Sequence, residues 1–317
     1  MTEDHLKAPL APFAGAKPPA PEWFGDALAI EPERGFITVA DARIETLAWG
    51  ERGKPGLLLM HGSGAHADWW SPLAPFFTDR YRVAALSWSG MGSSDWRESY
   101  TAEHFEQEAL EAARACGLYD DGGKPVVVGH SFGGRVAIAL GARHADAFKA
   151  TIIVDPPVFA PETLAEREKN RGPRRLHPHR VYSSFEAAMA RFRFAPMQPC
   201  SELYYADFIA RTSLTPASRE EDGGEGWTWK FDPFLWKSFR IESPKPLIRG
   251  LGCPAALIRG GRSKLMKKID ADSARQGPVS CPSHRALSRT QSPVTSCDWW
   301  SGNFRATPAP STTSIGQ

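Results

Sequence analysis

The stretch that decides the fold is VVVGHSFGG, residues 126–134, which contains the pattern G-x-S-x-G at residues 129–133. An apolar run precedes the pattern, and a run with helical character, FGGRVAIALGARH (132–144), follows it. In that context the serine lies at the apex of a sharp strand-to-helix turn, and the glycines remove side chains that would collide with neighbouring backbone. The sequence therefore predicts that Ser131 is a nucleophile whose hydroxyl stands above a sheet, near the positive end of the following helix. The alternative is a glycine-rich turn with an incidental serine.

The segments on either side of this stretch predict an α/β fold. The alternation in FITVADARIETLAWG, residues 36–50, indicates two antiparallel strands. Short apolar runs, typical of strands buried on both faces, follow at residues 56–60, 82–86, 125–129, 150–155 and 253–261. Helical patterns separate several of these runs, and the clearest begins after Thr101, a good helix cap, and ends at Gly117. Alternation at this spacing indicates a mostly parallel central sheet flanked by helices, with right-handed crossovers.

The composition changes along the chain and divides it into four parts. Residues 1–24 are rich in Pro and Ala and predict an extended arm. The core takes residues 25–155 and 246–272, and the Arg-rich and aromatic residues 156–245 between them show no clear strand, so we expect a helical cap inserted over the sheet. In residues 273–317, 19 of 45 residues are Ser, Thr or Pro and only four are Leu, Ile, Val or Met. We interpret this segment as an atypical tail, either disordered or translated in a shifted reading frame.

The charge balance and the cysteines narrow the classes of function. The 38 basic and 36 acidic residues give a net charge of +2, too balanced to indicate nucleic-acid binding. No run of about 18 apolar residues predicts a membrane helix, and the N-terminus lacks the apolar core of a secretory signal. The five cysteines include no C-x-x-C pair, which favours reduced thiols in a cytoplasm over a zinc site or a disulfide framework. We therefore expect a cytoplasmic protein that acts on a small-molecule substrate, with no nucleic-acid or membrane partner; the oligomeric state is left open.

An acyl-transfer nucleophile needs hydrogen-bond donors for the oxyanion that develops during attack. The backbone N–H of Phe132, the residue after the serine, supplies one donor. The second is expected from the loop that follows the apolar run GLLLM, where HGSG occupies residues 61–64. Within that loop we assign the donor to the N–H of Ser63. The alternative for HGSG is a tight turn without a catalytic role.

Three stretches together, LLLMHGSGAHADWW, LSWSGMGSSDW and VVVGHSFGG, resemble the α/β-hydrolase superfamily, with the order and spacing of its esterase and C–C-bond hydrolase branches. The resemblance covers roughly residues 36–270. It implies a mostly parallel, eight-stranded sheet with a helical cap inserted after the sixth strand, where residues 156–245 fit. It also implies a catalytic serine, acid and histidine in that chain order.

The acid and the histidine are harder to place on this sequence than the serine. Many relatives carry an Asp after the seventh strand, where this chain has Lys264. We therefore expect Asp155, at the end of the sixth strand, to orient the base, with Asp270 and Asp272 as weaker candidates. Asp155 could instead be a turn-forming residue before two prolines. The resemblance implies a catalytic histidine late in the chain, and His284 is the one histidine in its last third. We therefore assign the base to His284; alternatively, His284 is a solvent-exposed histidine of the tail without a catalytic role.

The predicted function is hydrolysis of a carboxylic ester or related acyl compound through an acyl-enzyme, chemistry that requires no metal or cofactor. We expect Gly62, Trp69 and His130 to contact the substrate. A serine at the strand-to-helix turn over residues 129–133, called the elbow below, argues against dehalogenase or epoxide chemistry, which would use an aspartate there. Two alternatives stay open: a hydrolase of C–C bonds in ring-cleavage products, and a non-catalytic protein of the same fold that binds ligands or partners.

Overall fold

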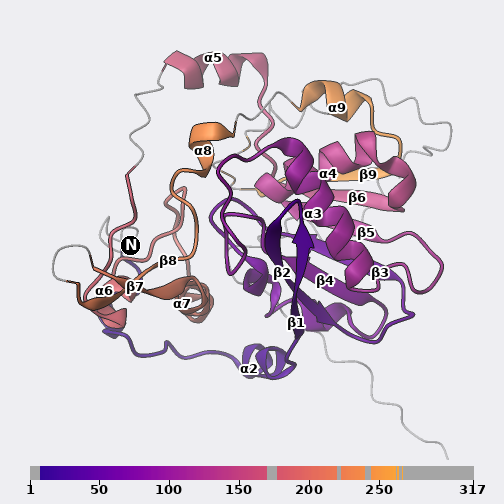
Figure 1. Cartoon of the computed structure of the whole chain (residues 1–317). Coiled ribbons are helices and arrows are strands. Elements are labelled where there is room, and N and C mark those ends of the chain that lie inside the picture. The colour runs from indigo at the N-terminus through magenta and orange to yellow at the C-terminus, as the bar shows by residue number, and fades with distance from the viewer. Residues whose placement is uncertain are drawn as a thin grey trace, which may run out of the picture.

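A seven-stranded sheet forms the centre of the part of the chain that the structure describes, which in this computed structural model is residues 8–169, 177–219, 223–239, 244–261, 263 and 266. The strands are β1 (Glu33–Val39), β2 (Ala42–Trp49), β3 (Gly56–Met60), β4 (Arg82–Leu86), β5 (Val126–His130), β6 (Ala150–Val154) and β9 (Ala255–Ile258). Their order across the sheet is β1-β2-β4-β3-β5-β6-β9 (Figure 1). The β1/β2 and β2/β4 pairs are antiparallel and the other pairs are parallel, which confirms the predicted mostly parallel sheet.

The two faces of the sheet carry separate apolar clusters because successive side chains of a strand point to opposite faces. In β3, Leu58 and Met60 join one cluster, whereas Leu57 and Leu59 join the other. The first cluster is covered by α3 (Ala102–Ala115), α4 (Phe132–Arg143) and α9 (Lys245–Arg249), and the second by the 3₁₀ helices η2 (Ala67–Trp70) and η3 (Ala74–Phe77). A further 3₁₀ turn, η4 (Ala145–Ala147), follows α4. Since both faces are covered, β3 and β4 are buried along their whole length, as their apolar runs predict.

The clearest predicted helix has the expected ends. The Thr101 hydroxyl accepts a hydrogen bond from the His104 N–H at 3.2 Å, which caps α3. At the other end Gly117 has a φ of 74°, a left-handed conformation that glycine adopts without steric cost. These ends fix α3 against β1, β3 and β4.

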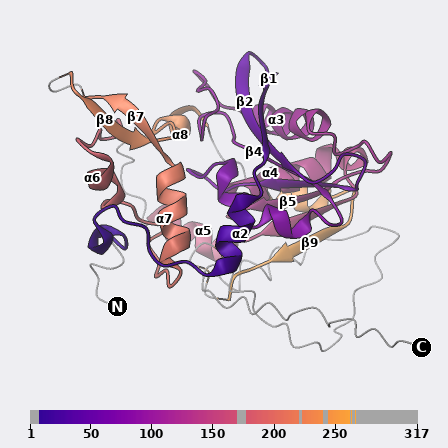
Figure 2. The ribbon, with the colours of Figure 1, turned by 90° about the horizontal axis from the view of Figure 1, so that it is seen from below.

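The segment inserted between β6 and β9 forms a second lobe beside the sheet (Figures 1 and 2). It contains α5 (Pro161–Lys169), α6 (Phe185–Met189), α7 (Leu203–Thr212), α8 (Leu235–Ser238) and an antiparallel hairpin of β7 (Leu214–Ser218) and β8 (Glu225–Trp229). The sequence predicted no strand in residues 156–245, and at this hairpin the prediction is wrong. A two-stranded ribbon needs no long apolar run, because cross-strand pairs such as Thr215 with Thr228 define it.

The N-terminal arm is partly helical rather than extended throughout. It includes a 3₁₀ turn, η1 (Ala11–Phe13), and the beginning of α2 (Glu22–Ala29). Leu10 is buried within the apolar cluster of the inserted segment, and the Phe24 ring of α2 lies 4.8 Å from the Tyr204 ring of α7. The arm thus runs from the inserted segment back to the sheet, with α2 beside α7 (Figure 2).

Several expectations fall on residues that the structure does not describe. Among the described residues the sheet has seven strands, and the eighth strand implied by the resemblance is not one of them. The predicted tail over 273–317 lies outside the described residues. Within the described part of the chain, no helix is long and apolar enough to cross a membrane.

Candidate active site

The predicted strand-to-helix turn is present between β5 and α4. Ser131 separates them and adopts φ 52° and ψ −111°, a conformation that non-glycine residues rarely take. Its N–H donates to the Val154 carbonyl of β6 at 2.8 Å, and its own carbonyl accepts from the Arg135 N–H in the first turn of α4. The serine is therefore held from both sides at the carboxyl end of the sheet, at the N-terminus of a helix.

Two glycines of the pattern have no room for a side chain. A Cβ on Gly129 would lie 2.2 Å from the Gly133 carbonyl oxygen, and a Cβ on Gly133 would lie 2.5 Å from the Met60 carbonyl oxygen. Both contacts are with backbone, which cannot rotate away. The glycines thus let α4 start directly against β3 and β5, and this close approach produces the sharp turn at Ser131.

The loop over residues 61–64 lies against this turn. A Cβ added to Gly62 would be 3.2 Å from both the Ser131 Cβ and the His130 Nδ1. Ser63 follows and is exposed, while the Phe132 side chain is buried beneath the start of α4. The structure therefore brings Gly62, His130 and Ser131 together, with Ser63 and Phe132 as their direct neighbours in the chain.

His61 fixes the position of this loop. Its Nε2 accepts from the Trp88 N–H at 3.1 Å, so the proton resides on Nδ1, which donates to the Gly62 carbonyl at 2.7 Å. The His61 carbonyl accepts from Trp88 Nε1 and from the Gly133 N–H, both at 3.1 Å. Burial lowers the pKa of His61 to about 3, so the imidazole is neutral and serves as a structural bridge rather than a base. Burial also lowers the pKa of His130, to about 4.

Asp155 follows β6, the strand next to β5, and also has a positive φ, of 47°. Its carboxylate accepts hydrogen bonds from the Gly260 N–H at 3.3 Å and from the Ser263 hydroxyl at 2.5 Å. Burial raises the pKa of Asp155 above its ordinary value, although the Ser263 hydrogen bond counters part of that effect. The structure thus places this carboxylate one strand away from Ser131, at the same edge of the sheet.

The weaker acid candidates Asp270 and Asp272, the predicted base His284 and the position of Lys264 lie outside the described residues. Within the described residues, no group of three or more His, Cys, Asp or Glu side chains could hold a metal ion.

A second arrangement of serine, histidine and aspartate, which no sequence motif indicates, lies at His66, Asp68 and Ser213. His66 Nε2 lies 2.9 Å from the Ser213 hydroxyl, and His66 Nδ1 lies 3.5 Å from an Asp68 carboxylate oxygen that Arg34 also approaches. Burial raises the pKa of Asp68, but hydrogen bonds from His66 and Arg34 outweigh it, and the pKa lies well below its ordinary value. His66 is 1% exposed and Ser213 is 7% exposed, so a substrate has no access to this serine. The arrangement joins the sheet to the inserted segment, and because Ser213 lies 147 positions after His66, no local motif contains both.

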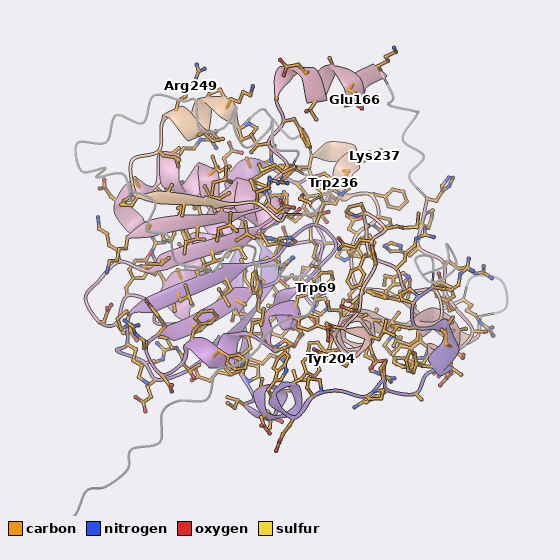
Figure 3. All side chains as sticks on the ribbon, turned by 180° about the vertical axis from the view of Figure 1, so that it is seen from behind. Trp69, Glu166, Tyr204, Trp236, Lys237 and Arg249 are labelled. Atoms are coloured by element: carbon orange, nitrogen blue, oxygen red, sulfur yellow. The ribbon has the colours of Figure 1, made fainter. Side chains whose placement is uncertain are left out.

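Two tryptophans at the boundary between the sheet and the inserted segment have different surroundings: Trp69, which we expect to contact the substrate, and Trp236 (Figure 3). Trp69 packs on the apolar cluster of the inserted segment, and its carbonyl accepts from the Tyr205 hydroxyl at 3.0 Å. Trp236 of α8 instead meets the Phe132 ring edge-on, with ring centroids 5.8 Å apart. Figure 3 shows both side chains where the sheet meets the inserted segment. Trp236 is thus in contact with a residue of the turn that carries Ser131.

The chain is similar in sequence to known hydrolases. Residues 57–293 match the model of the alpha/beta hydrolase family, a range that includes the loop over 61–64, the elbow and His284. The esterase Rv0045c of Mycobacterium tuberculosis is 28% identical over 244 residues, which cover 73% of each chain. The lipase LipV of the same bacterium is 36% identical over 111 residues, which cover 35% of this chain and 40% of LipV.

The solved structures that resemble the chain support the fold. The thioesterase domain from the curacin biosynthetic pathway superposes with a TM-score of 0.61 at 21% identity, covering 77% of this chain and 88% of that domain. E-2-(acetamidomethylene)succinate hydrolase also has a TM-score of 0.61, at 19% identity, covering 78% of this chain and 88% of that enzyme. At these identities the likeness shows the fold alone, and the predicted α/β-hydrolase fold is confirmed.

Proposed function

This chain belongs to the alpha/beta hydrolase family, and we propose that it acts as a serine hydrolase that cleaves a carboxylic ester or a related acyl compound. The observation that carries the proposal is the conformation of Ser131, a serine with positive φ between a parallel strand and a helix. A backbone of this kind costs about 1–3 kcal/mol and persists where the surrounding structure enforces it, as at active sites. Similarity to proteins named as an esterase and a lipase supports acyl chemistry.

The proposed reaction begins with attack of the Ser131 hydroxyl oxygen on the substrate carbonyl carbon, as its proton passes to a histidine. The N–H groups of Phe132 and Ser63 stabilise the resulting oxyanion. The protonated histidine then gives its proton to the leaving alcohol, and water, activated by the same base, hydrolyses the acyl-enzyme. We assign the base to His284 and the carboxylate that orients it to Asp155.

In this proposal the inserted segment over 156–245 acts as a cap that shapes the substrate site. Gly62 and His130 contact the acyl group because they lie against Ser131. Trp69 lines the boundary between the sheet and the cap, and Trp236 adds an aromatic surface above Phe132. A cap with these aromatic side chains favours an apolar or aromatic acyl substrate. The predicted cytoplasmic location stays a prediction.

Labelling with a fluorophosphonate, read by peptide mass spectrometry, tests the proposal. The probe reacts with a serine that a neighbouring base has activated, so we expect one label, on Ser131, and none in Ser131→Ala. Ser201→Ala is the matched control, because this exposed serine lies in the inserted segment and should leave the labelling unchanged. His284→Ala should slow labelling by about 10³-fold or more if His284 is the base.

The result that would overturn the proposal is a folded wild-type protein that stays unlabelled at Ser131. In that case a non-catalytic ligand-binding protein of the same fold becomes the better interpretation. Circular dichroism of the same samples establishes that the comparison is between folded proteins.

A further inference from the structure

The loop after β9 reaches back to Asp155. Because β6 and β9 are neighbouring parallel strands, their carboxyl ends lie side by side, and the Asp155 N–H donates to the Ile258 carbonyl at 2.8 Å. Beyond β9, the Gly260 N–H and the Ser263 hydroxyl turn toward the Asp155 carboxylate at 3.3 Å and 2.5 Å. One acid is therefore held by three contacts from a single segment that lies more than 100 residues away.

The Ser263 hydroxyl is itself oriented. The Met266 N–H donates to its oxygen at 3.0 Å, and the Ser263 N–H donates to the Gly260 carbonyl at 3.1 Å. A hydroxyl has one proton, and because the oxygen accepts from Met266, that proton is directed to Asp155. Met266 is fully buried, which anchors this turn in the core. The donor is thus preorganised before any substrate binds.

We propose that Ser263 is a positioning residue for the active site, which holds the Asp155 carboxylate in one orientation and keeps it ionised so that it can orient the catalytic base. This inference rests on the proposed function. The hydrogen bond occupies Oδ2 and stops rotation of the carboxylate, while Oδ1 accepts the longer hydrogen bond from the Gly260 N–H and retains a second lone pair for the N–H of the base. Charge-assisted hydrogen bonds of this type are stronger than neutral ones.

With Lys264 at the position where many relatives carry the acid, this chain supports its acid at another place. The acid stands at the end of β6, and the loop after β9 supplies a hydroxyl donor to it rather than a carboxylate. Asp155 is partly buried, and burial works against its charge. A donor at hydrogen-bond distance offsets that effect, so the two residues act as one unit.

The test combines a titration with a reactivity measurement on the full chain. The Asp155 carboxyl carbon is followed by ¹³C NMR against pH, and its signal is identified by its loss in Asp155→Asn. In Ser263→Ala we expect the Asp155 pKa to rise by about one pH unit and fluorophosphonate labelling of Ser131 to slow by about tenfold. Ser263→Thr keeps the hydroxyl and should restore both values. Thr78→Val removes a hydroxyl that donates to the Pro75 carbonyl at a distant site and should change neither.

Each result separates this inference from the proposed function. If wild type is labelled and Ser263→Ala has the same Asp155 titration or the same labelling rate as wild type, the positioning role is wrong while the serine hydrolase stands. If Ser263→Thr fails to restore either value, the effect of Ser263→Ala comes from packing, and the role is likewise wrong. If folded wild type is not labelled, both proposals fall, whatever the titration shows.

Discussion

The turns at the ends of β5 and β6 both contain a non-glycine residue with positive φ, but the surrounding structure enforces them in different ways. Ser131 has φ 52° and Asp155 has φ 47°, and neither is a glycine. At Ser131 the surroundings are backbone packed against backbone, where Gly129 and Gly133 leave no space for a side chain. At Asp155 the surroundings are hydrogen bonds, one to the main chain and two to the carboxylate.

This difference determines what each turn tolerates. Steric enforcement is local and strict, because a single methyl group at a glycine would overlap a carbonyl oxygen. Enforcement by hydrogen bonds depends on a distant segment of the chain, and it allows changes that preserve the shape of the side chain. The nucleophile should therefore be sensitive to small changes of volume, whereas the acid should be sensitive to changes of charge.

Asp155→Asn is expected to produce the largest effect and tests the chemical role of the second turn. The amide keeps the shape of the carboxylate and tolerates positive φ, but it cannot stabilise a protonated base. Labelling of Ser131 should slow on the order of 10³-fold or more. The thermal midpoint should stay equal or rise, because the raised pKa of Asp155 means that its charge at neutral pH opposes folding, and this cost disappears with the amide.

Both the labelling rate and the thermal midpoint of Asp155→Asn must agree with this prediction. A slow-labelling Asp155→Asn with a lowered thermal midpoint would mean that the carboxylate holds the fold together, and the turn-forming alternative would gain support. Unchanged labelling would remove Asp155 from the proposed mechanism.

Gly129→Ala is expected to produce the next largest effect and tests steric enforcement at the first turn. The added Cβ would lie 2.2 Å from a carbonyl oxygen, so β5 and α4 must separate. Overpacking of this kind costs about 3 kcal/mol, measured as the free energy of unfolding in urea. Gly25→Ala is the control, because its Cβ would meet nothing within 4 Å and α2 should gain about 0.5 kcal/mol. Equal stability of Gly129→Ala and wild type would show that the turn adapts.

The same difference explains which parts of the site could be predicted from the sequence. Glycines that permit close packing are adjacent to Ser131 in the chain, so the pattern at 129–133 indicates the elbow directly. Strands such as 56–60 were predictable because burial on both faces requires an unbroken apolar run. The support of Asp155 by Ser263 was not predictable, because it comes from a residue 108 positions away and needs only a hydroxyl.

The hairpin of β7 and β8 also depends on contacts that the local sequence does not reveal. In GWTW, the alternation of Trp227 and Trp229 with Thr228 was a signal of period two that could have indicated a strand. Its partner LTPAS contains Pro216 and no apolar run, so only the pairing itself makes it a strand. Pairing between segments is decided by tertiary packing, which local patterns do not contain.

His61 also supports the turn at Ser131, and its replacement should have the smallest of these effects. Because its imidazole is buried and neutral, it makes the stability of the folded chain depend on pH. The folded chain keeps this imidazole neutral down to a pKa of about 3, whereas in the unfolded chain it takes up a proton near pH 6.5. Between these values the unfolded state binds more protons, so stability falls as the pH falls through this window. His130, with a pKa of about 4, adds an effect of the same sign.

Urea unfolding at pH 7 and pH 5 measures this contribution. Wild type should lose stability over this interval, and His61→Gln should lose about 2 kcal/mol less, because a buried imidazole that stays neutral in the folded chain is gone. The exposed His177 provides the control, and His177→Gln should keep the pH dependence of wild type. If wild type and His61→Gln lose equal free energy of unfolding, His61 is not held neutral in the folded chain. The hydrogen bonds that His61 forms with Gly62 and Trp88 then do not support the turn at Ser131. A reduced loss would extend the comparison: the nucleophile turn is then held by packing and by a neutral histidine, and the acid turn by hydrogen bonds to a charge.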